Sequence, residues 1–135
     1  MTLENTSIED IRAFFKNDRF ATESLGAVIS SAEPGHAICE MTLNDSHLNA
    51  MNNVMGGVIF TLADFALAVA CNIGETPTVA VSNSIVFMNT AKGMHLSAEC
   101  VTDKSGRTLG FYTVTVTDEL GTLVAKMTAT CSRRA

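Results

Sequence analysis

Positive charge is scarce in this sequence and is nowhere concentrated. Nine Lys and Arg residues stand against fourteen Asp and Glu, for a formal net charge of −5 at pH 7. The one adjacent basic pair is Arg133-Arg134, near the C-terminal end. A protein that binds nucleic acid presents a basic stripe to the phosphates, so the sequence excludes this class of partner.

The sequence also lacks the marks of export and of a metal site. Residues 1–15, MTLENTSIEDIRAFF, are acidic and amphipathic, so we expect no signal peptide and a cytoplasmic location. The four cysteines lie roughly thirty residues apart in apolar surroundings, and this spacing matches no zinc pattern. We therefore expect four reduced, buried thiols and neither a metal nor another cofactor.

Apolar residues, in contrast, are plentiful. A chain of 135 residues fits one domain, residues 1–135, and 47% hydrophobic with 17% charged residues is a globular balance. The apolar share is slightly high for a lone small domain. We therefore expect a homo-oligomer in which neighbouring subunits cover part of the apolar surface.

The most apolar stretch, residues 54–71, predicts the centre of the fold. Apart from glycine, its only side chains that are not apolar are Thr61 and Asp64. Such a run is read as a membrane span, as buried strands or as a buried helix. An Asp at mid-span and the lack of a basic flank argue against the membrane, and the Ala, Leu and Phe content argues against strands. A helix that is apolar all round must be enclosed by protein.

The elements on either side supply that enclosure. Thr6-Ser7-Ile8-Glu9 is typical of a capping box and predicts a short helix with Ile8, Ile11, Phe14 and Phe15 on one face. Alternating and β-branched segments between turns predict six strands, at residues 27–32, 36–43, 78–88, 94–103, 108–118 and 123–132. One antiparallel sheet of five to six strands wrapped around the long apolar helix satisfies this order. This arrangement is the α+β hotdog architecture.

Asp64 is the first candidate functional residue. On an ideal helix its same-face neighbours include Phe60, Thr61 and Leu67, and no cation among them offsets the burial of a carboxylate. An isolated ionised group in such a place is costly, which indicates a partner from another segment or another subunit. The alternative is an Asp that caps a neighbouring backbone segment or is wetted at a helix edge.

Two further features precede Asp64. Glycine within a helix costs roughly 1 kcal/mol relative to Ala, so the pair Gly56-Gly57 needs a reason. Without side chains the first-turn amides admit a ligand, and a carbonyl docked on the Gly56 amide would be stabilised as it became an oxyanion. Close packing of a strand against the helix is the other reading. In the preceding loop, Asn49 either orients a water or the carboxylate, or makes an ordinary turn.

These residues belong to a longer pattern. His47-Leu48-Asn49, followed by Met55-Gly56-Gly57 and Leu62-Ala63-Asp64, resembles the signature of the phenylacetate-degradation (PaaI-like) type of hotdog thioesterase. That signature reads Asn, five variable positions often including a Gly, His-Gly-Gly, and after a short gap Leu-Ala-Asp. The likeness extends along nearly the whole chain, including Leu25-Gly26, Pro34-Gly35-His36-Ala37 and Ala70-Cys71-Asn72.

The resemblance implies an acyl-CoA thioesterase that acts on a medium-chain or aryl acyl group. Asp64 would be the general base on water or the nucleophile, the Gly56 amide would polarise the thioester carbonyl, and Asn49 would help to place the water or the carbonyl. In such proteins two protomers join their sheets, and Asp64 of one faces Asn49 and Gly56 of the other. These homodimers commonly associate again into homotetramers.

Met55 and Asn52 depart from the family pattern, which has His before the paired glycines and a Gly in the preceding loop. His47 is near enough in sequence to be a candidate substitute for that His. The residues expected to contact the substrate are Met55, Gly57, Asn52, Phe60, Ser82 and Phe87. The cations available for the coenzyme A phosphates are Lys92, Lys104, Arg107, Arg133 and Arg134.

Two other functions stay open on the sequence. One is a hotdog protein with weakened or lost catalysis that binds an acyl thioester or a related ligand, because the thioether of Met55 neither donates a strong hydrogen bond nor carries charge. The other is a dehydratase, since related folds include one. That chemistry normally needs a His together with an acid, and no His lies within the motif.

Overall fold

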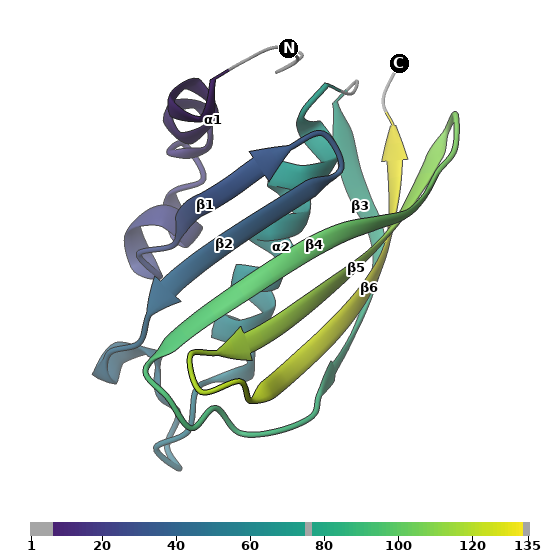
Figure 1. The fold of residues 1–135 in the computed structure, drawn as a ribbon. Coiled ribbons are helices and arrows are strands. Elements are labelled where there is room, and N and C mark those ends of the chain that lie inside the picture. The colour runs from purple at the N-terminus through teal and green to yellow at the C-terminus, as the bar shows by residue number, and fades with distance from the viewer. Residues whose placement is uncertain (1–6, 75–76, 134–135) are drawn as a thin grey trace.

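The computed structural model describes residues 7–74 and 77–133, which form one sheet with a long helix across it (Figure 1). The predicted strands and central helix are confirmed, with every boundary within two residues of its expected place. The elements are α1 (Ile8–Phe15), η1 (Phe20–Ser24), β1 (Val28–Glu33), β2 (His36–Thr42), η2 (Asp45–His47), α2 (Gly56–Asn72), β3 (Thr78–Phe87), β4 (His95–Ser105), β5 (Leu109–Asp118) and β6 (Leu123–Arg133). Here η1 is a turn of π-helix and η2 a turn of 3-10 helix.

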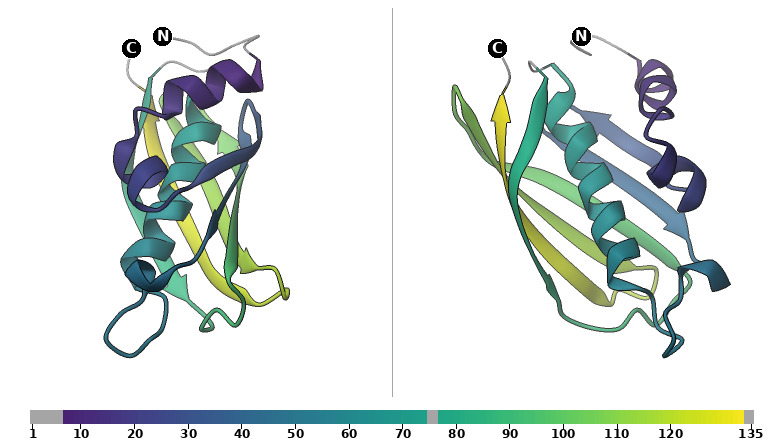
Figure 2. Two further views of the ribbon diagram at one scale, coloured as in Figure 1. Left: turned by 90° about the vertical axis from the view of Figure 1, so that its left-hand side faces the viewer. Right: turned by 180° about the vertical axis from the view of Figure 1, so that it is seen from behind.

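The six strands form one antiparallel sheet in the order β1-β2-β4-β5-β6-β3. Strands β1 and β3 are therefore its two edges. Helix α2 lies across one face of the curved sheet, with β3 beside it, and α1 stands beyond the β1 edge (Figure 2). This is the predicted hotdog arrangement, and it gives the sheet an inner face against α2 and an outer face away from it.

Alternation along the strands builds the core. On β2 the side chains of Ala37, Cys39 and Met41 are buried, as the sequence pattern predicts. They pack in one apolar cluster with Leu62 and Val69 of α2, which are also fully buried. The hydrophobic effect at this helix–sheet contact is the main source of stability in the fold.

Helix α2 is not enclosed on every side. Phe60, Thr61, Asp64 and Ala68 are only half-buried, and their spacing places them along one flank of the helix. The expectation of a helix with no wet face is therefore corrected, because the sheet of a single chain leaves this flank partly uncovered. The only acid of α2 lies on that flank.

Helix α1 begins one residue later than the predicted capping box. The Ser7 hydroxyl accepts the backbone N–H of Asp10 at 3.2 Å, which makes Ser7 the N-cap, while Thr6 lies outside the described residues. Ile11 and Phe15 are buried as expected, whereas Phe14 is 42% exposed and does not belong to the buried face. Phe15 packs edge-on against a ring of α2, that of Phe65.

All four cysteines are buried and free. Burial is the main cause that raises the pKa of both Cys39 and Cys100 to about 12, so both stay protonated at neutral pH. This agrees with the expectation of buried, reduced thiols. Within residues 7–74 and 77–133 no cluster of three or more metal-ligating side chains occurs. In the same part of the chain, no helix is both long and apolar enough to span a membrane.

The contact between α2 and the sheet can be tested at Leu62, which is 0% exposed. Replacing Leu62 with Ala should lower the free energy of unfolding by about 2–5 kcal/mol, because it leaves a cavity in a packed core. Urea denaturation measures this loss. The control is Leu120→Ala at a site that is 67% exposed, where a change within about 0.5 kcal/mol is expected. Equal losses in both variants would contradict the packing described here.

Candidate functional site

The start of α2 offers two free backbone donors. Met55 is the N-cap residue, and its side chain makes no capping hydrogen bond. In the described part of the chain, the amides of Gly56 and Gly57 find no hydrogen-bond acceptor. Because helix N-termini carry partial positive charge, these amides suit a carbonyl oxygen or an anion.

A cavity of about 370 Å³ opens beside Gly56. Its walls come from the end of the 49–55 loop, from the first turns of α2, and from the end of β3 with the segment that follows it. A methyl group on Gly56 would lie 3.3 Å from Cζ of Phe87, and one on Gly57 would lie 3.3 Å from Cε of Met55. Gly56 is thus both closely packed against β3, as one sequence interpretation has it, and open to a cavity, while the docking of a carbonyl on its amide stays a prediction.

Asp118 holds in place the backbone of residues 92 and 93, which directly follow the far wall of this cavity. One oxygen, Oδ2, accepts the backbone N–H groups of Lys92 and Gly93 at 2.8 and 3.0 Å, and Oδ1 accepts those of Leu120 and Thr122 at 3.0 and 2.9 Å. Burial alone would raise the pKa of Asp118, but these hydrogen bonds outweigh it and hold the pKa well below its ordinary value. Asp118 therefore holds its turn and the β3–β4 connection together as a carboxylate.

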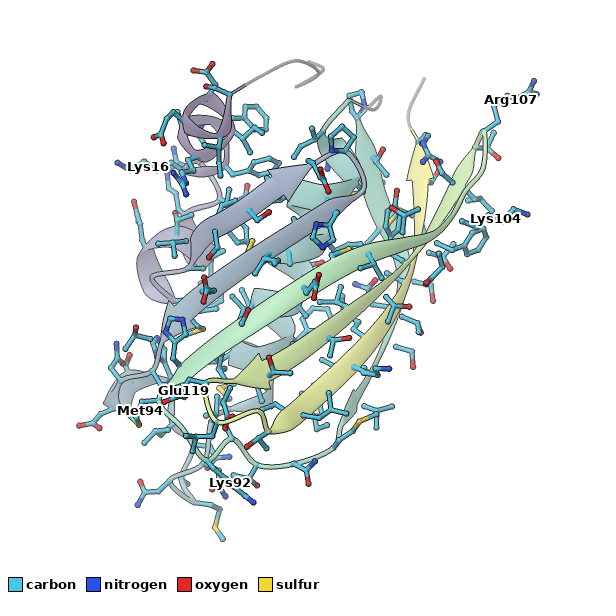
Figure 3. All side chains as sticks on the ribbon, viewed as in Figure 1. Lys16, Lys92, Met94, Lys104, Arg107 and Glu119 are labelled. Carbon is cyan, nitrogen blue, oxygen red and sulfur yellow. The ribbon has the colours of Figure 1, made fainter. Side chains whose placement is uncertain are left out.

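Glu119 also holds the segment between β3 and β4 in place. Its Oε1 accepts the N–H groups of Met94 and His95 at 3.1 and 3.0 Å, and these bonds lower its pKa. A methyl group on Gly93 would collide with this carboxylate, so a larger residue there would displace the Glu119 side chain from these hydrogen bonds. Glu119, Met94 and Lys92 lie together at one end of the molecule (Figure 3).

Asn49 organises the loop before α2. Its Oδ1 accepts the N–H groups of Met51 and Asn53 at 2.9 and 3.1 Å, so the turn chemistry considered from the sequence is present. The amide nitrogen of Asn49 has no partner among the residues described and stays available to a ligand. Asn52 has a φ of 62°, a left-handed conformation that Asn tolerates and glycine adopts freely. This explains how Asn52 stands where the family pattern often has Gly.

His47 does not replace the missing imidazole of the family pattern. Its ring is buried, with Nδ1 accepting the Asn44 N–H at 3.0 Å and Nε2 at 3.3 Å from the Ser24 carbonyl oxygen. Both ring nitrogens therefore serve the loop. The interpretation of His47 as a substitute is corrected, because its polar atoms are used by the backbone.

Asp64 is half-buried in a second cavity, of about 360 Å³, formed with η1 and the residues before it. Burial raises its pKa, and the nearby charge of Asp18 raises it further. In residues 7–74 and 77–133 nothing donates a hydrogen bond or pairs in charge with this carboxylate. The capping role considered from the sequence is thus not seen. The carboxylate is open to water and to a ligand.

Asp64 and Gly56 do not meet within one chain. They are eight residues apart on one helix, or about 12 Å along its axis at about 1.5 Å per residue. The two residues also line different cavities. A carbonyl bound to the Gly56 amide is therefore out of reach of a water held by Asp64 of the same chain.

The remaining residues predicted to contact the substrate lie in different parts of the structure. Phe87 lines the Gly56 cavity, and Phe60 lies on the open flank of α2. Ser82 pairs across the sheet with Thr130 and points to the outer face, away from α2. A β-bulge between Ala80 and Ser82 reverses the alternation and puts Ser82 on this face, and its contact with a substrate stays a prediction. The inward polar residue of β3 is Asn83, which sequence reasoning missed because a bulge leaves no clear mark in sequence.

The model of the thioesterase superfamily matches residues 51–125. The chain belongs to the thioesterase superfamily. The human protein named acyl-coenzyme A thioesterase 13 is 32% identical to this chain. The matched region covers 93% of this chain and 94% of the human protein. The Escherichia coli PaaI structure is 29% identical, with a TM-score of 0.88 over 95% and 93% of the two chains. A Streptococcus mutans protein solved with acetyl CoA is 30% identical, with a TM-score of 0.76 over 81% and 89%.

The carboxylate of Asp64, which has no partner in the described chain, should lower the folding stability of this thioesterase-superfamily protein. Folding raises the pKa of Asp64. The loss of folding stability is therefore absent when the pH is below the unfolded-state pKa of about 3.9, and it is complete when the pH is above the pKa of the folded state. Asp64→Asn should therefore raise Tm near neutral pH, and the gain should shrink as pH falls toward about 4. Thermal unfolding across this pH range measures it. Asp45→Asn, at an exposed site, is the control. A lower Tm for Asp64→Asn at neutral pH would show a stabilising partner.

Proposed function

We propose that this chain is an acyl-CoA thioesterase whose active site is completed by a second copy of the chain. The observation that carries the proposal is an unpartnered, half-buried carboxylate, Asp64, two helical turns beyond the free amide of Gly56. Relatives named acyl-coenzyme A thioesterase, and a neighbour solved with acetyl CoA, support coenzyme A thioesters as the substrate class.

In this proposal the Gly56 amide of one protomer donates a hydrogen bond to the thioester carbonyl oxygen. In one route, Asp64 of the other protomer takes a proton from water as the water oxygen bonds to the carbonyl carbon, the carbon–sulfur bond then breaks, and the coenzyme A sulfur leaves as the thiol with that proton. In the other route, the Asp64 carboxylate attacks the carbon and forms a mixed anhydride while the coenzyme A thiolate leaves and is protonated by solvent, and water then hydrolyses the anhydride to the free acid and the Asp64 carboxylate. The Asn49 amide nitrogen, with no partner in the described chain, is available to the water or the carbonyl.

The exposed edge of β3 supports the assembly. Val79, Val81 and Val86 are exposed along this strand, and no strand of the described chain pairs with its outer side. Antiparallel pairing of two copies of β3 would extend the sheet and set the two α2 helices in opposite directions. Gly56 of one protomer would then approach Asp64 of the other. By the family resemblance, two such homodimers would join as a homotetramer.

The cations lie at two ends of the chain. Lys92 directly follows the segment that walls the Gly56 cavity, whereas Lys104 and Arg107 stand at the tip of the β4–β5 hairpin, far from it (Figure 3). Arg133 donates to the Gly106 carbonyl oxygen and so braces that hairpin. A two-fold partner would bring its hairpin toward the Gly56 end, so we assign the coenzyme A phosphates to Lys92 and to Lys104 and Arg107 of the second protomer.

The acyl group would meet Phe87 and Met55, which border the Gly56 amide, and Phe60 on the open flank of α2. These apolar side chains suit a medium-chain or aryl acyl group, and an adaptable thioether accepts several shapes. Four buried, free cysteines fit a reducing compartment, which supports action in the cytoplasm.

Asp64→Asn is the central test. The variant should lose about 10³-fold or more in kcat on octanoyl-CoA and phenylacetyl-CoA, because the amide can neither accept the proton nor attack. Release of free thiol measures turnover, and gel filtration checks that the oligomer is unchanged. Asp45→Asn is the control and should keep wild-type turnover. Full activity in Asp64→Asn would overturn the proposal.

Met55 supplies a second test, which concerns catalytic strength. Its side chain is 54% exposed and lies against Gly57, where it offers no imidazole to the carbonyl. Met55→His should raise kcat about tenfold or more, with KM within about twofold, because an imidazole can donate to the developing oxyanion. Met51→His, on the exposed loop, is the control. Unchanged kcat in Met55→His would show that the thioether causes no catalytic loss.

A further inference from the structure

A further cavity lies between α1 and the β1 edge of the sheet. Its volume is about 470 Å³, which is larger than the volumes of the cavities at Gly56 and Asp64. Residues of α1 and its C-cap, one residue of η1, residues 27–30 and the Phe65 ring of α2 line it. This α1–β1 cavity therefore has the size of a site for a small molecule, for which about 300–1,000 Å³ is typical.

The walls of the α1–β1 cavity are apolar. Phe15, Ala27, Ile29 and Phe65 all line it, and each of these side chains is only 3–5% exposed. The rings of Phe15 and Phe65 meet edge-on with their centroids 6.2 Å apart, which fixes the wall on the side of α2. Such walls offer no partner to a polar group, so the body of a ligand that fills the cavity must itself be apolar.

Two cations stand at the cavity, Arg12 and Lys16. The guanidinium of Arg12 is already engaged, since Nε donates to the Ile29 carbonyl oxygen at 3.0 Å and Nη1 pairs with Glu9 at 2.9 Å. The ammonium of Lys16 pairs with no acid within residues 7–74 and 77–133. One unpaired positive charge beside apolar walls matches a ligand with a single negative charge.

The backbone of Lys16 is held at the cavity by η1. The Thr22 hydroxyl lies within hydrogen-bonding distance of the carbonyl oxygens of Lys16 and Asp18, at 3.1 and 2.9 Å. Figure 3 shows Lys16 beside α1, far from the three labelled cations that we assign to the coenzyme A phosphates. Lys16 therefore serves a different part of the molecule.

The α1–β1 cavity is separate from the Asp64 cavity. Residues 18–21 line the Asp64 cavity, whereas Lys16 and Thr22 line the α1–β1 cavity, and Phe65 borders both. The buried Phe65 ring and the start of η1 thus stand between the two spaces. A ligand in the α1–β1 cavity would leave the Asp64 carboxylate open to water and to substrate.

We propose that the α1–β1 cavity is a binding site for an apolar monocarboxylate of the size of a medium-chain fatty acid, whose carboxylate pairs with Lys16. The hydrocarbon chain would lie against Phe15, Ile29 and Phe65, and the burial of this chain supplies most of the affinity. The carboxylate stays beside an exposed ammonium, so neither charge has to lose all its water. A phosphate monoester fits less well, because its second charge would meet no second unpaired cation. This inference does not depend on the proposed thioesterase activity.

Isothermal titration with sodium octanoate tests the site. The wild type should bind octanoate but not acetate, which has no chain to fill the apolar walls. Lys16→Gln should weaken octanoate binding about three- to tenfold, while the binding of neutral 1-octanol stays within about twofold, because only the charge has been removed. Lys126→Gln, at an exposed site on the outer face of β6, is the matched control and should bind octanoate as the wild type does.

Val28 supplies an independent variant. Its side chain lines the cavity and is 58% exposed, so Val28→Glu should leave the fold intact. The added carboxylate would repel that of the ligand, and octanoate binding should fall about tenfold or more. The KM for octanoyl-CoA should stay within about twofold. Val101→Glu, at a 39% exposed site on β4, is the matched control and should keep wild-type octanoate binding.

The outcomes that would overturn this site are distinct. They are a wild type that binds no octanoate, wild-type affinity in both Lys16→Gln and Val28→Glu, or an equal loss of 1-octanol binding in Lys16→Gln. Loss of octanoate binding in Phe87→Ala would instead place the ligand in the Gly56 cavity. A smaller oligomer for Val28→Glu in gel filtration would show that a second copy of the chain fills the space. Because the titration needs no turnover, an inactive wild type would defeat the proposed function and leave this site standing.

Discussion

Burial of α2 against the inner face of the sheet is the contact on which the rest of the structure depends. Beyond the free amides of its first turn, the helix satisfies its own backbone hydrogen bonds, so its apolar side chains can be covered by strands from both halves of the chain. A sheet of six strands curves around most of the helix and stops at the β3 edge. Asp64 lies on the flank of the helix that the sheet leaves open, so the limit of the enclosure decides where the proposed chemistry would take place.

Polar side chains elsewhere in the fold make hydrogen bonds to the backbone. His47 gives both ring nitrogens to the loop, Asp118 accepts four backbone amides, and Asn72 bonds to the start of β3. The exceptions are the Asp64 carboxylate, the Asn83 oxygen and the two unpaired edges of the sheet. A chain that meets its hydrogen-bonding needs in one region and not in the next points to a ligand or a second subunit in the latter.

The sequence predicted the strands and the central helix because their signals are local: alternation, β-branched runs and a long apolar stretch. It also singled out Asp64, since an acid without a cation on an apolar helix is unusual wherever the helix packs. Prediction from the sequence failed where the position of a side chain depends on tertiary structure. The bulge before Ser82 exchanged the faces of Ser82 and Asn83, and the burial of His47 follows from a carbonyl of η1, far away in sequence. The 12 Å separation of Asp64 and Gly56 follows from helix geometry, but their assignment to separate cavities needed the structure.

The β5–β6 turn reaches across the sheet to the wall of the Gly56 cavity. Asp118 and Glu119 hold the backbone of residues 92–95, which directly follow the wall residues 87–91, so the position of that wall depends on a turn that does not itself line the cavity. The shape of the cavity can thus be engineered through residues that lie outside it. Altering the length of this turn would shift the segment after β3 without substituting any residue that lines the cavity.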